Sequence, residues 1–217
     1  MSRKITVKGV GSFKAKPDYV VLSLALNTTR MNYEKAMNRE AEKLELLTNA
    51  LTSIGIKKDA IKTTNFNVET RYESEKDVNN NYKRVFKGFV CHHNLKVGFD
   101  FDSKFLTEVL QAVASSIAHP EFTIHFTVKN PNDINEELLR SATKNALKKA
   151  EILCDAANCK LGELHSIDYN WGEIDIYSNT RYNMSDDLVM MASSKSIDIE
   201  PDDINVSDSV TFVWEIE

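Results

Sequence analysis

Polar and apolar residues recur along the chain with two periods, and together these predict an α+β fold. Alternation in steps of two is typical of strands buried on one side. It occurs at residues 4–13, 19–27, 61–72, 85–101, 122–128, 163–171 and 205–217. Apolar residues in steps of three and four predict helices at residues 33–51, 103–118 and 133–158. The expected element order is ββαββαβαββ, with mainly antiparallel sheets.

Local signals between these elements add detail. Pro17-Asp18 marks a turn, so the first two strands are expected to form a hairpin. Asn32 is placed to cap the first helix, and Gly55 is placed to end it. In the last strand, the alternation is expected to slip near Asp208.

Residues 171–203 show neither period, although they contain the apolar run Leu188-Val189-Met190-Met191. Leaving such a run in water costs free energy. A long irregular segment within an ordered domain usually binds something or moves. We therefore expect residues 174–199 either to take part in self-association or to pack over the chain's own sheet, and the composition leaves both open.

Composition narrows the class of protein. The chain has 217 residues, of which 42% are hydrophobic and 27% charged, which is enough for a core without metal or disulfide staples. A net charge of −5 argues against nucleic acid as the main partner. Residues 1–10 alternate and do not form the apolar centre of an export signal, and no apolar run is long enough to span a membrane. The resulting expectation is a cytosolic protein with three reduced cysteines.

Glycine and cysteine motifs give weak signals. Gly9-Val10-Gly11 follows a strand but lacks the third glycine and the helix of a dinucleotide site. A twist or bulge in an edge strand is the expected use of these glycines. Cys154 and Cys159 have neither the spacing of a redox dithiol nor a second pair for zinc, so structural thiols are expected.

Cys91-His92-His93 is the densest group of soft metal ligands in the sequence. On a strand, Cys91 and His93 face one side and His92 the other, which leaves at most two ligands together. His125 or His165, each on another predicted strand, could supply a further ligand, but the sequence alone does not place either residue next to Cys91 and His93. On this basis no metal, cofactor or catalytic residue is assigned.

Several segments, taken in order, carry a family resemblance. They are Ile5-Thr6-Val7-Lys8-Gly9 with Lys16-Pro17-Asp18, Leu51 to Ile56 with Ile61-Lys62-Thr63-Thr64-Asn65-Phe66, Lys149-Ala150-Glu151 with Lys160-Leu161-Gly162, and Ile199-Glu200-Pro201 with Val206-Ser207 and Val210-Thr211. Their order and spacing resemble the SIMPL-domain family, a group of unknown function that includes bacterial periplasmic and outer-membrane immunogenic proteins.

This resemblance implies two intertwined two-layer α/β sandwiches. Residues 1–87 with 172–217 would form an outer unit built from both termini, and residues 88–171 would form an inserted β-α-β-α-β unit. Many relatives are exported, some assemble into ring- or channel-like homo-oligomers, some are linked to oxidative-stress tolerance, and a mammalian relative is a signalling adaptor.

The leading functional hypothesis is a non-enzymatic SIMPL-type protein that acts through self-association and protein–protein contacts, with a role related to stress. An alternative of a different class is an enzyme with an unrecognised site near Cys91, His93 and His125. A third is a monomeric signalling adaptor. A homo-oligomer with protein partners is expected, without nucleic acid and without a membrane span.

Overall fold

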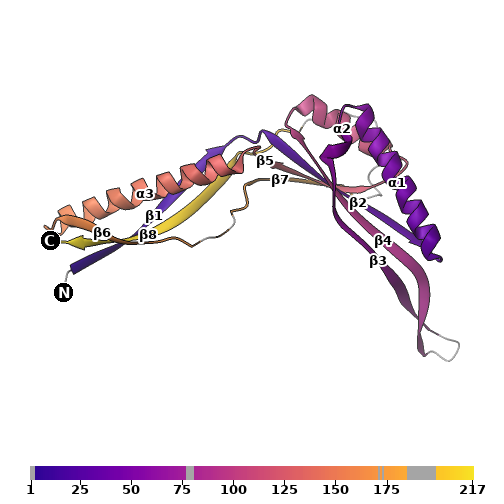
Figure 1. Cartoon of the computed structure of the whole chain (residues 1–217), viewed down its shortest axis with the longest axis horizontal. Coiled ribbons are helices and arrows are strands. Elements are labelled where there is room, and N and C mark those ends of the chain that lie inside the picture. Colours follow the sequence, from indigo (N-terminus) through magenta and orange to yellow (C-terminus); the bar gives the residue numbers. More distant parts are fainter. Residues whose placement is uncertain (1–2, 77–80, 171, 173, 185–198) are drawn as a thin grey trace. The chain divides into compact units, whose positions relative to one another are not determined.

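The computed structural model describes residues 3–76, 81–170, 172, 174–184 and 199–217. It divides into two compact units, which are described separately (Figure 1). The first unit consists of Met1–Pro17, Thr127–Asn179 and Asp202–Glu217, and the second of Asp18–Phe126 and Thr180–Pro201. The expected α+β class is confirmed.

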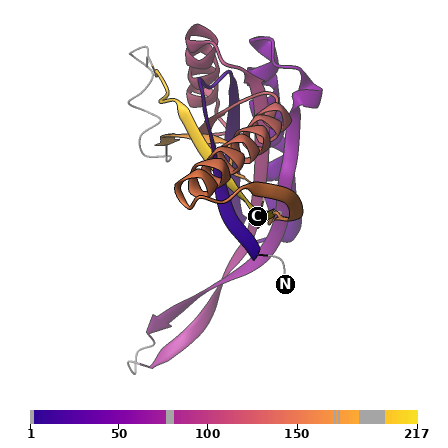
Figure 2. The same ribbon diagram turned by 90° about the vertical axis from the view of Figure 1, so that its left-hand side faces the viewer.

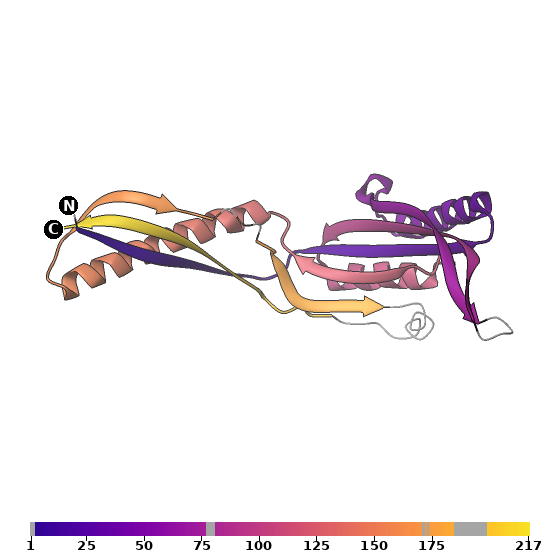
Figure 3. The same ribbon diagram turned by 90° about the horizontal axis from the view of Figure 1, so that it is seen from below.

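The first unit is a three-stranded sheet with one helix on it. Strand β8 (Ile204–Ile216) lies between β1 (Arg3–Ala15) and β6 (Leu161–Asp168), and both neighbours run antiparallel to it. Helix α3 (Pro131–Ala156) runs along this sheet, as Figure 3 shows. The pairing of β1 with β8 joins two segments from opposite ends of the sequence, as expected for a unit built from both termini.

The helix packs on β1 through small residues. Ala142, Ala146 and Ala150 are fully buried on α3. Opposite them, a Cβ added to Gly9 would stand 2.1 Å from the Ala142 carbonyl oxygen, and one added to Gly11 equally close to the Leu138 carbonyl oxygen. The register of β1 with β8 is unbroken, so the expected bulge is wrong. These glycines instead allow a helix to approach the strand closely.

Strand β8 alternates without interruption. Every even position from Ile204 to Trp214 except Asp208 is buried, and Asp208 continues the same face, so the expected slip is also wrong. Asp208 accepts a hydrogen bond of 2.9 Å from the Tyr169 hydroxyl, which gives a carboxylate a partner on the covered side of the sheet.

The second unit is a five-stranded sheet with two helices on one face. The strand order is β3 (Ile61–Lys76), β4 (Tyr82–Asp100), β2 (Tyr19–Arg30), β5 (Glu121–Thr127) and β7 (Tyr177–Met184). Helices α1 (Tyr33–Ser53) and α2 (Ser103–Ser115) share one apolar core with the sheet, and a short 3-10 helix, η1 (Lys58–Ala60), precedes β3. Asn32 caps α1 as predicted, accepting a hydrogen bond from the Lys35 amide.

The hairpin of β3 and β4 extends beyond the rest of its sheet (Figure 2). Strand β2 pairs with β4 only as far as Phe89, while β3 follows β4 to Tyr82. We call this two-stranded extension, residues 71–76 and 82–88, the β3–β4 arm. Edge-to-face rings run along it from Tyr72 through Phe86 to Phe89, with centroid separations of 5.5 and 5.4 Å. Such contacts support a two-stranded ribbon, which is marginal by itself.

Three organisational expectations differ from the structure. Strands β1 and β2 form no hairpin with each other: β1 pairs with β8 and β2 with β4, because the chain passes from one unit to the other between Pro17 and Asp18. The expected boundary at 87/88 falls inside β4, which pairs with β3 on both sides of a register shift at this point. Strand β7 was not predicted, and it adds one strand between the last two strands of the expected order.

Candidate functional site

Cys91, His92 and His93 lie on β4, inside the sheet of the second unit. The predicted alternation is confirmed. Cys91 and His93 are buried on the side of the helices, whereas His92 lies on the other side, where its Nδ1 is 2.8 Å from the Asn27 side-chain oxygen. The Cys91 thiol lies 4.0 Å from the Met37 sulfur of α1. Burial, and then the charge of Glu40, raise the pKa of Cys91. A protonated, covered thiol of this kind is a weak nucleophile.

His93 is held by contacts on three sides. Its Nε2 is 2.9 Å from the Thr63 hydroxyl, and its ring meets the edge of Phe66 at a centroid separation of 5.0 Å. Its Nδ1 lies 3.6 Å from a carboxylate oxygen of Glu40. Burial lowers the pKa of His93, and the nearby Glu40 charge opposes this only in part. The imidazole therefore stays neutral at neutral pH.

Glu40 is the polar residue that sequence reasoning missed. It is only 2% exposed, on the buried face of α1 that also carries Ala36, Leu47 and Leu51. Neither carboxylate oxygen has a hydrogen-bond partner within the described part of the chain. Its position, four residues after Ala36 and seven before Leu47, places it on the buried face of the helix. Sequence reasoning did not include it in that face because glutamate is a charged residue. Glu40 and His93 therefore lie side by side beneath α1, where both side chains are buried.

His125 does not join this pair. It lies on β5, and β2 separates that strand from β4. Its neighbours Phe122, Ile124 and Phe126 are buried with the helices, so His125 points to the opposite face of the sheet from His93. Burial and the charge of Arg181 lower its pKa. The residues named for an enzymatic site are thus not brought together. Across the described residues, no three His, Cys, Asp or Glu side chains form a group suited to a metal ion.

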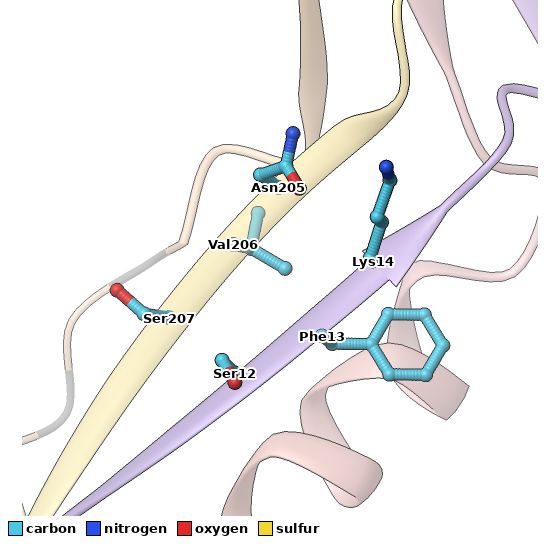
Figure 4. Close-up of a pocket in the computed structure, with 6 residues that line it drawn as sticks. All are labelled: Ser12, Phe13, Lys14, Asn205, Val206 and Ser207. Atoms are coloured by element: carbon cyan, nitrogen blue, oxygen red, sulfur yellow. The ribbon is translucent and has the colours of Figure 1, made fainter.

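A hollow of about 390 Å³ lies along β1 and β8 in the first unit (Figure 4). Figure 4 shows Lys14 and Asn205 pointing the same way, while the Phe13 ring extends toward the helix. Lys14 forms an ion pair of 2.9 Å with Asp203, and this hydrogen bond raises its pKa. The hollow therefore offers neutral hydroxyl and amide groups and a lysine that already has a partner.

A more distinctive surface lies along β6. Helix α3 contacts β1 most, β8 less and β6 least. A helix is about 10 Å wide and strands lie about 4.8 Å apart, so one helix covers roughly two strands. Leu164 pairs with Trp214 and Ile167 with Phe212, which places both on the side of the sheet that α3 covers. They remain 49% and 56% exposed. We call Leu164 and Ile167 the β6 flank.

The β6 flank was not predicted, because strict alternation was expected along this strand. The register of β6 shifts twice, between Leu161 and Leu164 and between Leu164 and Ser166. These shifts bring residues spaced by three, Leu161, Leu164 and Ile167, to one face. The sequence signal was this three-residue spacing of apolar positions, which an alternating strand does not show.

Comparison with known proteins decides the family. The profile of the SIMPL family, described as a protein of unknown function (DUF541), matches residues 5–214. The chain belongs to the SIMPL family. The resemblance seen in the sequence is confirmed.

Two curated relatives are each named a 26 kDa periplasmic immunogenic protein, one from Brucella melitensis and one from Brucella abortus. Each is 24% identical over 164 residues, which is 76% of this chain. The match spans 65% of the length of each relative. Both names contradict the cytosolic location expected from the first residues, and they point to the periplasm. Among the described residues, no helix combines the length and hydropathy needed to cross a bilayer.

Proposed function

We propose that this SIMPL protein is a non-enzymatic periplasmic protein that acts through self-association, and that the β6 flank is the contact surface. The observation that carries the proposal is the incomplete cover of the first unit's sheet: α3 lies over β1 and leaves Leu164 and Ile167 in solvent. The names of the two relatives support the periplasmic location.

A second copy of the same chain fits the sequence of this edge. When two β6 strands pair antiparallel about Leu164, Leu161 of each copy meets Ile167 of the other. In the same register, Glu163 meets His165, and Lys160 meets Asp168. Apolar residues thus oppose apolar ones, an acidic residue opposes a lysine, and Glu163 opposes a histidine with which it can form a hydrogen bond, which favours antiparallel pairing. An edge strand also presents unpaired backbone groups that another strand can satisfy.

The contact is isologous, so each substitution acts twice. Fully burying an exposed leucine contributes about 1.5–3 kcal/mol, and Leu164 is 49% exposed, so its burial in the contact contributes about half of this in each copy. Leu164→Asp removes this contribution in both copies and sets two carboxylates against each other. We expect the association constant to fall by at least about tenfold, since the apolar loss over both copies is about 1.5–3 kcal/mol and the repulsion between the carboxylates adds to it.

Light scattering and sedimentation across a concentration series measure this effect on the full chain. Val10→Asp is the matched control, because Val10 is 44% exposed on the other side of the same sheet. Mixing Leu164→Asp with Leu164→Lys should restore association, since opposite charges then meet. A wild-type chain that stays monomeric at high concentration supports the adaptor hypothesis instead, and an unchanged Leu164→Asp oligomer rejects the β6 flank.

A further inference from the structure

The end of α3 brings two cysteines together through its backbone. The Cys159 amide donates to the Cys154 carbonyl at 3.0 Å, and the Asn158 amide donates to the Asp155 carbonyl at 3.2 Å. Asn158 has a φ of 54°, in the left-handed region. These two bonds around a left-handed residue define a Schellman motif. In that motif, the side chains at the positions of Cys154 and Cys159 frequently contact each other.

The two thiols differ in exposure. Cys154 is 1% exposed, whereas Cys159 is half-buried and its thiol lies 3.5 Å from the Cys154 carbonyl oxygen. Burial raises the pKa of Cys154, and a hydrogen bond with Cys159 and its charge raise it further. Both cysteines are free thiols. The spacing alone predicted structural thiols, because it does not show the turn that joins them.

We propose that Cys154 and Cys159 form a reversible disulfide at the end of α3. The oxidant is a disulfide of a small thiol or of an oxidoreductase. The Cys159 thiolate attacks one sulfur of that disulfide, which releases a first thiolate and leaves a mixed disulfide on Cys159. Cys154 then loses its proton and attacks the Cys159 sulfur. A second thiolate leaves, so two protein thiols are oxidised and one external disulfide is reduced.

The position gives this bond a structural effect. Directly after Cys159, Lys160 exchanges two backbone hydrogen bonds with Glu217, of 2.8 and 3.0 Å, so the turn also holds the end of β8. A disulfide across the turn would restrain the backbone on which these two hydrogen bonds depend. An oxidising compartment such as the periplasm favours the bond. The proposal does not depend on self-association, because both cysteines lie in one chain.

Thiol trapping of the full chain tests the proposal. The reduced protein is equilibrated with oxidised and reduced glutathione at a series of ratios, quenched with acid, alkylated with N-ethylmaleimide and digested with trypsin. Both cysteines fall in one tryptic peptide, residues 150–160. We expect this peptide to appear without label and about 2 Da lighter than the reduced form, to regain two labels after dithiothreitol, and to form equally at all protein concentrations.

Three variants sharpen the result. Cys91→Ala serves as the control and should oxidise like the wild type, since Cys91 belongs to the other unit. Cys154→Ala should stop at a mixed glutathione disulfide on Cys159, whereas Cys159→Ser should react far more slowly because Cys154 is covered. A wild-type peptide that keeps two labels at every ratio overturns the proposal. So does one that stops at the mixed disulfide.

Discussion

Replacing Gly9 by alanine tests the close packing of α3 on β1. The new Cβ would stand 2.1 Å from the Ala142 carbonyl oxygen and 2.7 Å from the Ala146 Cβ, where ordinary contact begins at 3.4 Å. The helix must therefore move away by roughly 1 Å along its middle turns, and a close-packed interior resists such a shift. Overpacking costs about 1–3 kcal/mol. Because the obstructing atom belongs to the backbone, we expect a loss of about 3 kcal/mol.

Urea unfolding followed by circular dichroism measures this loss. Gly172→Ala is the matched control, because nothing lies within 4 Å of its added Cβ. That variant should be neutral or gain about 0.4–1 kcal/mol from reduced entropy of the unfolded chain. Adding Ala146→Gly to Gly9→Ala should restore little, since the Ala142 carbonyl stays in place. An unchanged midpoint for Gly9→Ala, or full rescue by Ala146→Gly, would refute the backbone-clash reasoning.

Two further predictions concern His93 and Asn158. The pKa of His93 is lowered on folding, so below its usual value of 6.5 the unfolded chain binds more protons and stability falls as the pH falls. Thermal unfolding between pH 7.5 and 5 should show a shallower fall for His93→Gln, and also for His125→Gln, whose pKa is lowered too. Identical slopes in all three proteins would contradict this. Asn158 has a φ of 54°, so Asn158→Ala should lower the free energy of unfolding by about 1 kcal/mol, whereas Asn158→Gly should not. Equal urea midpoints for these two variants would argue against strain at the turn.

Periodicity predicted the elements well where one face of each is buried. Strand β5 shows this clearly, since Phe122, Ile124 and Phe126 are buried as their alternation indicated. Strand β7 was missed because the run from Tyr177 to Met184 alternates no apolar residues and lies at the edge of its sheet. Pairing was harder to predict than element type. The turn at Pro17 suggested a local hairpin, whereas β1 has its partner at the far end of the sequence.

The candidate surfaces depended on contacts that no local pattern contains. Glu40 reads as a solvated residue of an amphipathic helix until its burial against His93 is known. From the sequence, Leu164 would be assigned to the core. The structure shows that it is exposed, because α3 covers β1 and β8 more than β6. The faces of Cys91, His92 and His93 were predictable, because strand alternation alone decides them.

The pairing of β1 with β8 also decides the order in which the protein is completed during synthesis. Among the described elements, β1 emerges first and β8, the central strand of its sheet, emerges last. At a translation rate of about 5–20 residues per second, β1 waits roughly 10–40 s for its neighbour. During that time Asp18–Phe126 is already complete and contains four of the five strands of the second sheet. The second unit can therefore begin to fold before the chain is complete, whereas the first unit must keep β1 and α3 apart from other chains until β8 arrives.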